Sequence, residues 1–141
     1  MKTHFNPPEI WSPAGRAFSQ GVVVDSGSTL FMTGQVAWDK NHTIVGVGDV
    51  RAQFKQCLEN VAHLLTTVGG TFDDIVSLTI YFLRHEDLPV IQEVRAQYFQ
   101  PQTAPVSILI QVPGLVAPEF LIELVPVAVL PIERRKHPPS H

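Results

Sequence analysis

Residues 120–130 read FLIELVPVAVL, an apolar run that a single carboxylate, Glu123, interrupts. Successive side chains of a strand point to opposite faces of its sheet, so large apolar residues at nearly every position require burial on both faces. Pro126 and Pro131 keep the apolar stretch well short of the roughly 20 residues that a membrane helix needs. The run therefore predicts a sheet strand of a soluble protein.

Glu123 is the most informative residue of this run. An acid among apolar neighbours is costly to ionise unless a partner compensates its charge. The segment that we expect to face it across the sheet, residues 105–112, contains no lysine or arginine. Glu123 is therefore either a packing residue that accepts hydrogen bonds from backbone amides or a group retained for proton chemistry, and the sequence leaves both open.

Changes of hydrophobic period predict the elements before this strand. β-branched and apolar residues predict strands over 20–25 and 29–35, and the polar cluster at 25–28 predicts a hairpin turn between them. Residues 44–47 predict a third, minor strand. The first dozen residues contain several prolines and predict an irregular arm.

Two helices and one more strand are predicted in the middle of the chain. The first helix begins after Asp49, a favourable N-cap, and ends at Gly69 and Gly70. Its apolar stripe steps by three or four residues through Val50, Phe54, Leu58, Val61, Leu65 and Val68. Alternation over 76–82 predicts a strand, and a second helix capped near Asp87 follows. The apolar side of the second helix is Leu88, Ile91, Val94 and Tyr98.

Composition indicates a single globular domain. The chain has 141 residues, of which 45% are hydrophobic and 16% charged, enough for one ordinary core. The net charge of -3 gives no general attraction to nucleic acid or to anionic membranes. One cysteine, Cys57, rules out an intramolecular disulfide, and the N-terminus lacks the pattern of a signal peptide, so we expect a cytoplasmic protein.

The order of elements predicts an α+β domain, residues 15–131, in which two helices pack on one face of a mixed sheet. An N-terminal arm, 1–14, precedes the domain, and a C-terminal tail, 132–141, follows it. Two helices cover only one sheet face, whereas the last strand carries apolar residues on both. We therefore expect a homo-oligomer whose sheets pack together, and alternation leaves open which face meets the helices.

Several short motifs follow one another at defined spacing. They are Gly15-Arg16-Ala17-Phe18-Ser19-Gln20-Gly21, Met32-Thr33-Gly34-Gln35, Gln53 with Leu58-Glu59-Asn60-Val61, Gly69-Gly70 with Asp74-Ile75-Val76, Tyr98-Phe99, and Ile122-Glu123 with Val127-Ala128-Val129. Together they resemble the reactive intermediate deaminase (RidA/YjgF) family from about residue 15 to residue 130. The resemblance implies a chorismate-mutase-like subunit, a homotrimer whose sheets form a central barrel, and three ligand clefts between subunits.

The resemblance also implies a catalytic pattern. In deaminases of this family, an arginine near the start of the penultimate strand binds the carboxylate of an imine or enamine derived from an amino acid. A glutamate on the last strand helps to activate water. The glutamate position resembles Glu123, and the arginine position resembles Ser107, or Val106 after a slip of one residue. The family's pocket tyrosine corresponds to Phe18.

Further ligand-binding candidates follow from the same resemblance. Phe18 and Leu109 would form apolar walls, and backbone amides near Gly34 and Leu109 would contact the ligand, as they do in the family's deaminases. Gln92 is a further candidate. The six histidines show no metal-binding spacing, so we expect neither a metal nor a cofactor.

The departure at Ser107 changes the expected ligand. No lysine or arginine lies between Arg95 and Arg134, so the cation of the family is missing from the strand. Arg16, in the first loop, is the candidate substitute cation. Because Glu123 attracts a cation and a serine cannot replace a guanidinium, we expect an uncharged or cationic imine or enamine instead of the usual 2-aminoacrylate type.

Three functions stay open from the sequence. The first is a trimer that binds a small organic ligand and hydrolyses or tautomerises it. The second is a ligand-binding or regulatory protein without catalysis. The third, an endoribonuclease or translation inhibitor, requires a general base and a phosphate-binding cation in one cleft, and the sequence points to neither. The expected partners are a small molecule and further copies of the chain, with no role for nucleic acid or a membrane.

Overall fold

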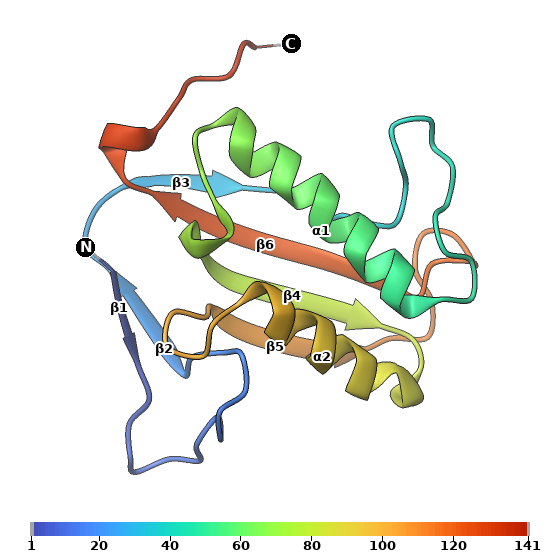
Figure 1. Ribbon diagram of the computed structural model, residues 1–141, viewed down its shortest axis with the longest axis horizontal. Helices are drawn as coiled ribbons and strands as arrows, with labels where there is room; N and C mark the ends of the chain where they lie inside the picture. Colours follow the sequence, from blue (N-terminus) through green and yellow to red (C-terminus); the bar gives the residue numbers. More distant parts are fainter. Residues whose placement is uncertain (1, 141) are drawn as a thin grey trace.

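The computed structural model describes residues 2–140 and has two layers, a sheet and a pair of helices (Figure 1). The strands are β1 (Lys2–Phe5), β2 (Gly21–Val24), β3 (Ser28–Phe31), β4 (Ile75–Phe82), β5 (Val106–Gln111) and β6 (Ile122–Leu130). The helices are α1 (Val50–Thr67) and α2 (Leu88–Tyr98). Short 3-10 helices lie at Phe72–Asp74, His85–Asp87 and Ile132–Arg134.

The main sheet has four strands in the order β3-β6-β4-β5. Strands β4 and β5 are parallel and α2 connects them, so the chain crosses over the sheet before it enters β5. Strand β6 then returns antiparallel between β3 and β4. The expectation that residues 105–112 face Glu123 is therefore wrong. The strand partner of Glu123 is Tyr81 on β4, and β5 lies one strand further away.

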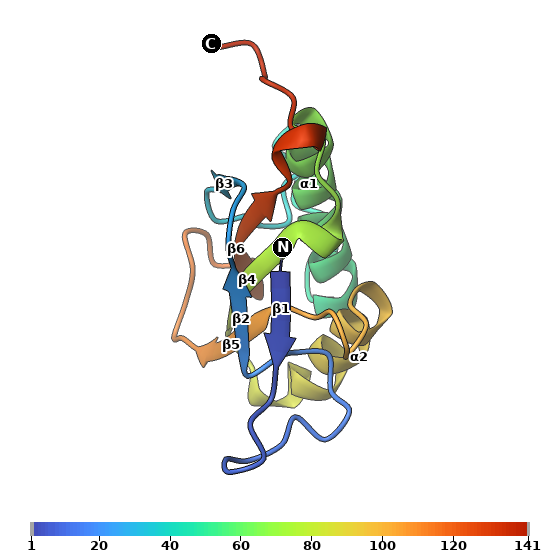
Figure 2. The same ribbon diagram turned by 90° about the vertical axis from the view of Figure 1, so that its left-hand side faces the viewer.

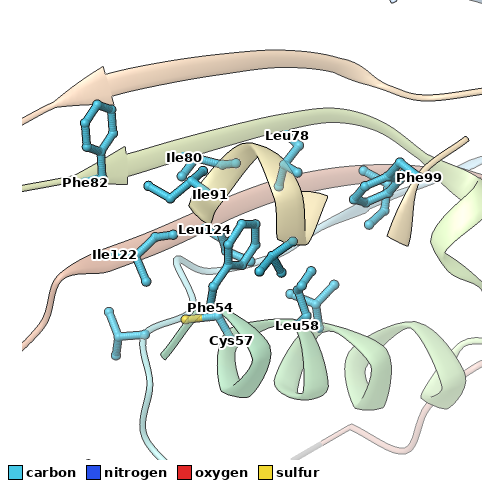
Figure 3. Packing of buried hydrophobic residues seen from close by; sticks show 14 of the residues in the cluster. Phe54, Cys57, Leu58, Leu78, Ile80, Phe82, Ile91, Phe99, Ile122 and Leu124 are labelled. Carbon is cyan, nitrogen blue, oxygen red and sulfur yellow. The ribbon is translucent and has the colours of Figure 1, made fainter. Parts of the chain in front are cut away.

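Both helices lie on one face of the main sheet, as the sequence predicts (Figures 1 and 2). The residues of β6 that are buried on this side are Ile122, Leu124, Pro126, Ala128 and Leu130. Figure 3 shows the core that Ile122 and Leu124 share with Phe54, Cys57 and Leu58 of α1, Leu78, Ile80 and Phe82 of β4, and Ile91 of α2. Burial of the even-numbered residues of β6 assigns Glu123 to the opposite, uncovered face.

The helix ends follow local chemistry. Asp49 caps α1, because its Oδ1 accepts a hydrogen bond from the Ala52 N–H at 3.1 Å, as predicted. Gly69, at φ +81°, takes the left-handed conformation just beyond the helix, also as predicted. Asp87 precedes α2 but does not cap it, because its carboxylate instead accepts two hydrogen bonds from Arg84.

The first strands pair differently from the prediction. Strands β2 and β3 form no hairpin: β2 pairs with β1, and β3 pairs with β6 in the main sheet. The segment Lys2–Phe5, predicted to be irregular, forms β1, and the Phe5 ring covers Gly21 so closely that no side chain fits there. Gly27, at φ +137°, lies against the Leu130 backbone and allows the chain to turn onto the edge of β6.

The predicted minor strand at 44–47 does not form. Ile44 makes only an isolated bridge, with Trp38. The Asp39 carboxylate accepts hydrogen bonds from the Asn41 and Thr43 N–H groups at 2.8 and 3.0 Å. These bonds fix a turn, which replaces strand pairing in this segment.

An ion pair holds the start of the C-terminal tail to the body of the molecule. The two side-chain oxygens of Asp74, a buried residue, accept hydrogen bonds from Arg134 at 2.7 and 3.0 Å. The Asp74 carboxylate also accepts one from the Thr71 N–H at 2.8 Å. We call Asp74 and Arg134 the C-terminal anchor. The anchor ties residue 134 to the turn before β4. Because Arg134 pairs with Asp74, the buried carboxylate keeps a partner of opposite charge.

The uncovered sheet face is rich in apolar side chains. Phe31 is 78% exposed, Ile108 47% and Ile110 38%. An exposed apolar surface of this kind marks an interaction site more often than a free surface. Among residues 2–140, no helix is both long and apolar enough to cross a membrane.

Candidate functional site

Glu123 lies near the start of β6, on the uncovered face of the sheet. Tyr81 of β4 is its strand partner, and Ile110 of β5 pairs with Tyr81 from the other side. The Glu123 side chain is half-buried in the single chain, and none of the ion pairs among residues 2–140 includes it. The structure therefore places an unpaired carboxylate on an apolar surface.

A β-bulge lies beside this carboxylate. The pairing of β3 with β6 is regular up to Phe31 and Val127, and pairing resumes at Gln35 and Leu124. Four residue steps on one side match three on the other, so one extra residue bulges between the two pairings. A Cβ at Gly34 would collide with the carboxylate oxygen Oε2. Gly34 therefore allows the backbone to approach the carboxylate.

A second cluster forms around an arginine that the sequence analysis did not assign to the site. Arg95, on α2, is only 2% exposed. Its Nη1 donates a hydrogen bond to the Ser107 Oγ at 2.9 Å, and its guanidinium carbon lies 5.4 Å from the centre of the Phe18 ring. The helix therefore supplies, beside Ser107, a cation that the strand lacks.

The charge of Arg95 has no carboxylate beside it. Burial lowers the pKa of the Arg95 guanidinium, and the positive charge of Arg16 lowers that pKa further. The Nε atom is buried and has no hydrogen-bond partner among residues 2–140. Arg16, the predicted substitute cation, is exposed. It is close enough for its charge to lower the pKa of Arg95, but the cation that contacts Ser107 is Arg95 itself.

The loop that carries Phe18 is held to the start of β5. The Ser19 N–H donates to the Pro105 carbonyl at 2.9 Å, and the Ser19 hydroxyl donates to the Ala104 carbonyl at 2.6 Å. The Trp11 ring packs against the Phe18 ring, with 5.8 Å between the ring centres. These contacts place the Phe18 ring over Arg95, where a cation–π interaction partly compensates the buried charge.

The remaining candidates divide between these clusters. Ser107 and Leu109 are paired with Leu78 and Ile80, so they lie on the helix side of the sheet, opposite to Glu123. Gln92 is exposed on α2. Within one chain, the sheet therefore separates a carboxylate cluster (Glu123 and Gly34) from a cation cluster (Arg95, Ser107 and Phe18). Neither cluster lines the two hollows of about 320 and 470 Å³ on the surface of the single chain.

One sequence signal could have revealed Arg95. The buried side of α2 includes Ile91 and Val94, and Arg95 follows Ile91 by four residues, so it lies on the same side of the helix. An arginine within an apolar stripe is unusual because its charge must be compensated after burial. Its partner Ser107 comes from another element, so the sequence does not reveal the contact.

Cys57 lies in the core on α1 and has no role in either cluster. Burial raises the pKa of its thiol to about 12, and the negative charge of Glu123 contributes to the increase. The thiol is therefore protonated at neutral pH and inert as a nucleophile, as expected for a buried cysteine. Among residues 2–140, no three His, Cys, Asp or Glu side chains come together in a group that could hold a metal ion.

Comparison with known proteins identifies a matching family and similar proteins. A family model described as endoribonuclease L-PSP matches residues 10–130. The 3-aminoacrylate deaminase RutC of Acinetobacter baylyi is 37% identical over 99 residues, which cover 70% of this chain and 77% of the relative.

Solved structures agree with this assignment. The crystal structure of YyfB, a protein of unknown function of the conserved Rid family from Yersinia pestis, has a TM-score of 0.85 and 33% identity, covering 92% of this chain and 98% of that one. A putative endoribonuclease from Thermotoga maritima has a TM-score of 0.67 and 27% identity, covering 80% of this chain and 86% of that one. The chain therefore belongs to the endoribonuclease L-PSP family, the RidA/YjgF family that its motifs resemble.

Proposed function

We propose that this protein is a Rid-type hydrolase of small imines or enamines that works as a homotrimer. The observation that carries the proposal is the Glu123 carboxylate, which lies against the Gly34 backbone on the uncovered sheet face. It is a proton-transfer group, and within residues 2–140 no cation pairs with it. It also lies on the apolar surface where a second copy would pack.

The separation of the two clusters supports a cleft between copies. Glu123 and Ser107 lie on opposite faces of the sheet within one chain, so one small ligand is not placed to touch both. If the uncovered face of one copy packs near edge strand β5 of the next, the carboxylate cluster of the first meets the cation cluster of the second. Such a head-to-tail contact closes into a ring when the rotation allows it, and a trimer is one closed solution.

The proposed reaction is the addition of water to a C=N bond. An enamine first gains a proton on carbon and becomes an imine. Glu123 takes a proton from water as the water oxygen bonds to the imine carbon, and then returns the proton to the nitrogen. The hydroxyl of the adduct then gives its proton to Glu123, which passes it to the nitrogen, and the C–N bond breaks as the C=O bond forms, so that ammonia leaves and a carbonyl product remains. Water is the only co-reactant, and the glutamate ends the cycle ionised, as it began.

The relative RutC suggests which substrate to test first. Its name assigns it the deamination of 3-aminoacrylate, which is an enamine. The 2-aminoacrylate and 2-iminopropanoate pair, on which the deaminases of the family act, provides a second test. These compounds carry a carboxylate, so turnover of either would contradict the sequence-based expectation of an uncharged or cationic substrate.

Ammonia release from freshly generated substrate tests the proposal. We expect turnover by the wild-type protein and a loss of at least about 100-fold in Glu123→Gln, because general acid–base groups contribute 10²–10⁴-fold. Glu119→Gln is the matched control, because Glu119 is an exposed acid a few residues earlier, in the loop that leads into β6. Light scattering should give the mass of three chains for all forms. Full turnover in Glu123→Gln, or a monomeric wild type, would contradict the proposal.

A further inference from the structure

Helix α1 carries three amide side chains that the proposed reaction does not use. Gln53, Gln56 and Asn60 follow one another at steps of three and four residues, so they lie along one side of the helix. Gln53 is 0% exposed. Burial of an amide is costly unless hydrogen bonds pair its donors and its acceptor, whereas a leucine at the same position would have no such requirement. The partners of these amides therefore indicate the role of the row.

Gln53 holds the loop that leads into β6. Its Nε2 donates hydrogen bonds to the Glu119 carbonyl at 2.9 Å and to the Gly46 carbonyl at 3.1 Å. Its Oε1 accepts one from the Leu121 N–H at 2.8 Å. Both N–H groups of the amide and its oxygen are thus paired. Leu121 precedes Glu123 by two residues, so these bonds fix the backbone just before the carboxylate.

Asn60, further along α1, holds the segment that follows Gly34. Its Nδ2 donates to the Val36 carbonyl at 3.2 Å and to the Trp38 carbonyl at 2.9 Å. Its Oδ1 accepts a hydrogen bond from the Gln56 side chain at 3.0 Å, which fixes the orientation of the amide. The backbone just after Gly34 is therefore tied to the helix.

The two held segments, residues 36–38 and 119–121, contact each other. The Trp38 ring lies edge-on to the Phe120 ring, with 5.1 Å between the ring centres. The regular pairing of β3 with β6 does not reach either segment, because β3 ends at Phe31 and β6 begins after residue 121. Hydrogen bonds from α1 therefore take the place of strand pairing in these two segments.

Glu123 lies between the points that α1 holds. Gln35 exchanges two backbone hydrogen bonds with Leu124, at 2.8 and 2.9 Å. Gln35 follows Gly34 directly and precedes the segment that Asn60 holds. The carboxylate itself lies against the Gly34 backbone. A shift of the held segments would therefore move the atoms on both sides of the carboxylate.

We propose that Gln53 and Asn60 are positioning residues for Glu123, which fix the place of its carboxylate through the two held segments. This inference rests on the proposed hydrolase function and names residues that set the geometry of its proton-transfer group. Both amides belong to α1, which lies on the covered face of the sheet, opposite to the carboxylate (Figure 1). They therefore act through the backbone and leave the carboxylate and cation clusters with their own side chains.

Steady-state ammonia release by the intact protein tests the proposal. Asn60→Ala removes the donors to residues 36–38, and Gln53→Met keeps the length of the side chain without its hydrogen bonds. Gln56→Ala is the control in the same row, because the hydrogen bond of Gln56 goes to a side chain. Asp74→Asn is the control for lost stability, because it lies at the opposite end of β4 from the carboxylate. Rates would be measured at a temperature where circular dichroism shows every variant to be folded.

We expect kcat to fall at least about tenfold in Asn60→Ala and Gln53→Met, because a displacement of about 1 Å at a reacting group has effects of that order or larger. KM should stay close to that of the wild type, because the lost interaction acts on the reacting step. The two controls should keep the wild-type kcat. If Gln53→Met does not fold, Asn60→Ala decides the test, because Asn60 is partly exposed and less costly to remove.

A merely structural role for the amides predicts a different result. It would lower the unfolding midpoint and leave kcat of the folded protein intact. An unchanged kcat in Asn60→Ala would therefore overturn the proposal. A rise in KM alone, or an equal loss of kcat in Asp74→Asn, would also overturn it.

Nuclear magnetic resonance of the backbone amides distinguishes failure of this inference from failure of the proposed reaction. The Gly34 amide should lose order in Asn60→Ala, and the Leu121 N–H should exchange faster with deuterium in Gln53→Met. The amides of β5 should behave as in the wild type. A wild type that releases no ammonia, together with these changes, would disprove the hydrolase and leave α1 as the element that fixes the carboxylate. Wild-type ammonia release, with kcat and the Gly34 amide unchanged in Asn60→Ala, would disprove the inference and leave the hydrolase standing.

Discussion

The C-terminal anchor and the cation cluster each contain an arginine. In the anchor a carboxylate pairs with the arginine, and in the cation cluster the arginine contacts uncharged groups. In the anchor, Arg134 is 44% exposed at its side chain and donates two hydrogen bonds to Asp74. In the cation cluster, Arg95 is buried and has a serine and a phenyl ring as neighbours. A charge that only stabilises a fold is paired within the chain, so an unpaired one indicates a partner that comes from outside.

The acids Asp74 and Glu123 differ in the same way, because within residues 2–140 one is paired with a cation and the other is not. Asp74 is buried and accepts hydrogen bonds from a guanidinium and from the Thr71 N–H. Glu123 is half-buried on an apolar sheet face, with the Gly34 backbone as its nearest support. The paired charges therefore predict effects on stability, and the unpaired charges predict effects on ligand binding and turnover.

Asp74→Asn should give the largest effect on stability. It removes the acceptor charge and leaves Arg134 with a poorer partner, although the exposure of Arg134 reduces the loss. We expect a decrease of about 2 kcal/mol in the free energy of unfolding in urea, from hydrogen bonds to charged groups. Glu93→Gln, which removes the exposed pair with Arg51, should leave the free energy of unfolding nearly unchanged, because solvent screens an exposed ion pair. Similar decreases in the free energy of unfolding of the two variants would show that the buried ion pair stabilises the fold no more than the exposed one.

Low pH should destabilise the protein through the carboxylate of Asp74. Burial alone would raise the pKa of the Asp74 carboxyl, but the hydrogen bonds from Arg134 and Thr71 outweigh it and lower that pKa below its ordinary value of 3.8. Its contribution to stability is therefore present above that value and is lost as the pH falls through the lower pKa of the folded state. Wild-type stability should fall more steeply than that of Asp74→Asn below about pH 4. Parallel curves for the two proteins would contradict this assignment.

Gly34→Ala should affect turnover more than stability. The new Cβ would meet Oε2 of Glu123, and the flexible side chain can move away from it. We expect ammonia release to fall at least about tenfold, because a displacement of about 1 Å at the reacting group has effects of that order or larger. Gly114→Ala is the control, because no atom lies within 4 Å of the position of its Cβ. Unchanged turnover in Gly34→Ala would show that the carboxylate position is not critical.

Cys57 should give the smallest effect. Because burial is the main cause of its high pKa, about 12, an aromatic disulfide reagent at pH 8 should not react with the native protein. Reaction should appear once guanidinium chloride unfolds the chain. Glu123→Gln should remain equally unreactive, since the carboxylate is only the second cause. Rapid reaction of the native wild type would mean that α1 opens easily.

The sequence predicts the local elements of this fold well. The helix that begins after Asp49, the alternation in β4 and the proline-containing start of α2 each depend on residues close together in the chain. The uncovered apolar face also follows from β6, whose residues are apolar on both sides. Periodicity and capping act over a few residues, so these features are visible in the sequence.

Pairing between distant segments could not be predicted in the same way. The hairpin of β2 and β3 is the shortest connection, yet β2 pairs with β1 and β3 pairs with β6. The β4–α2–β5 crossover separates β5 from β6 and leaves Tyr81 beside Glu123. Arg95 reaches Ser107 through the same crossover, so the cation cluster depends on tertiary structure.

Mixed trimers test most directly the central claim that the unpaired charges of two copies form one site. Glu123→Gln and Arg95→Met would be purified separately, mixed in equal amounts under conditions of subunit exchange that mass spectrometry verifies, and assayed for ammonia release. One interface in four would by chance combine both native residues, so we expect roughly a quarter of wild-type turnover to return. No recovery after complete exchange would contradict the claim and place both residues in the site of a single chain or in none.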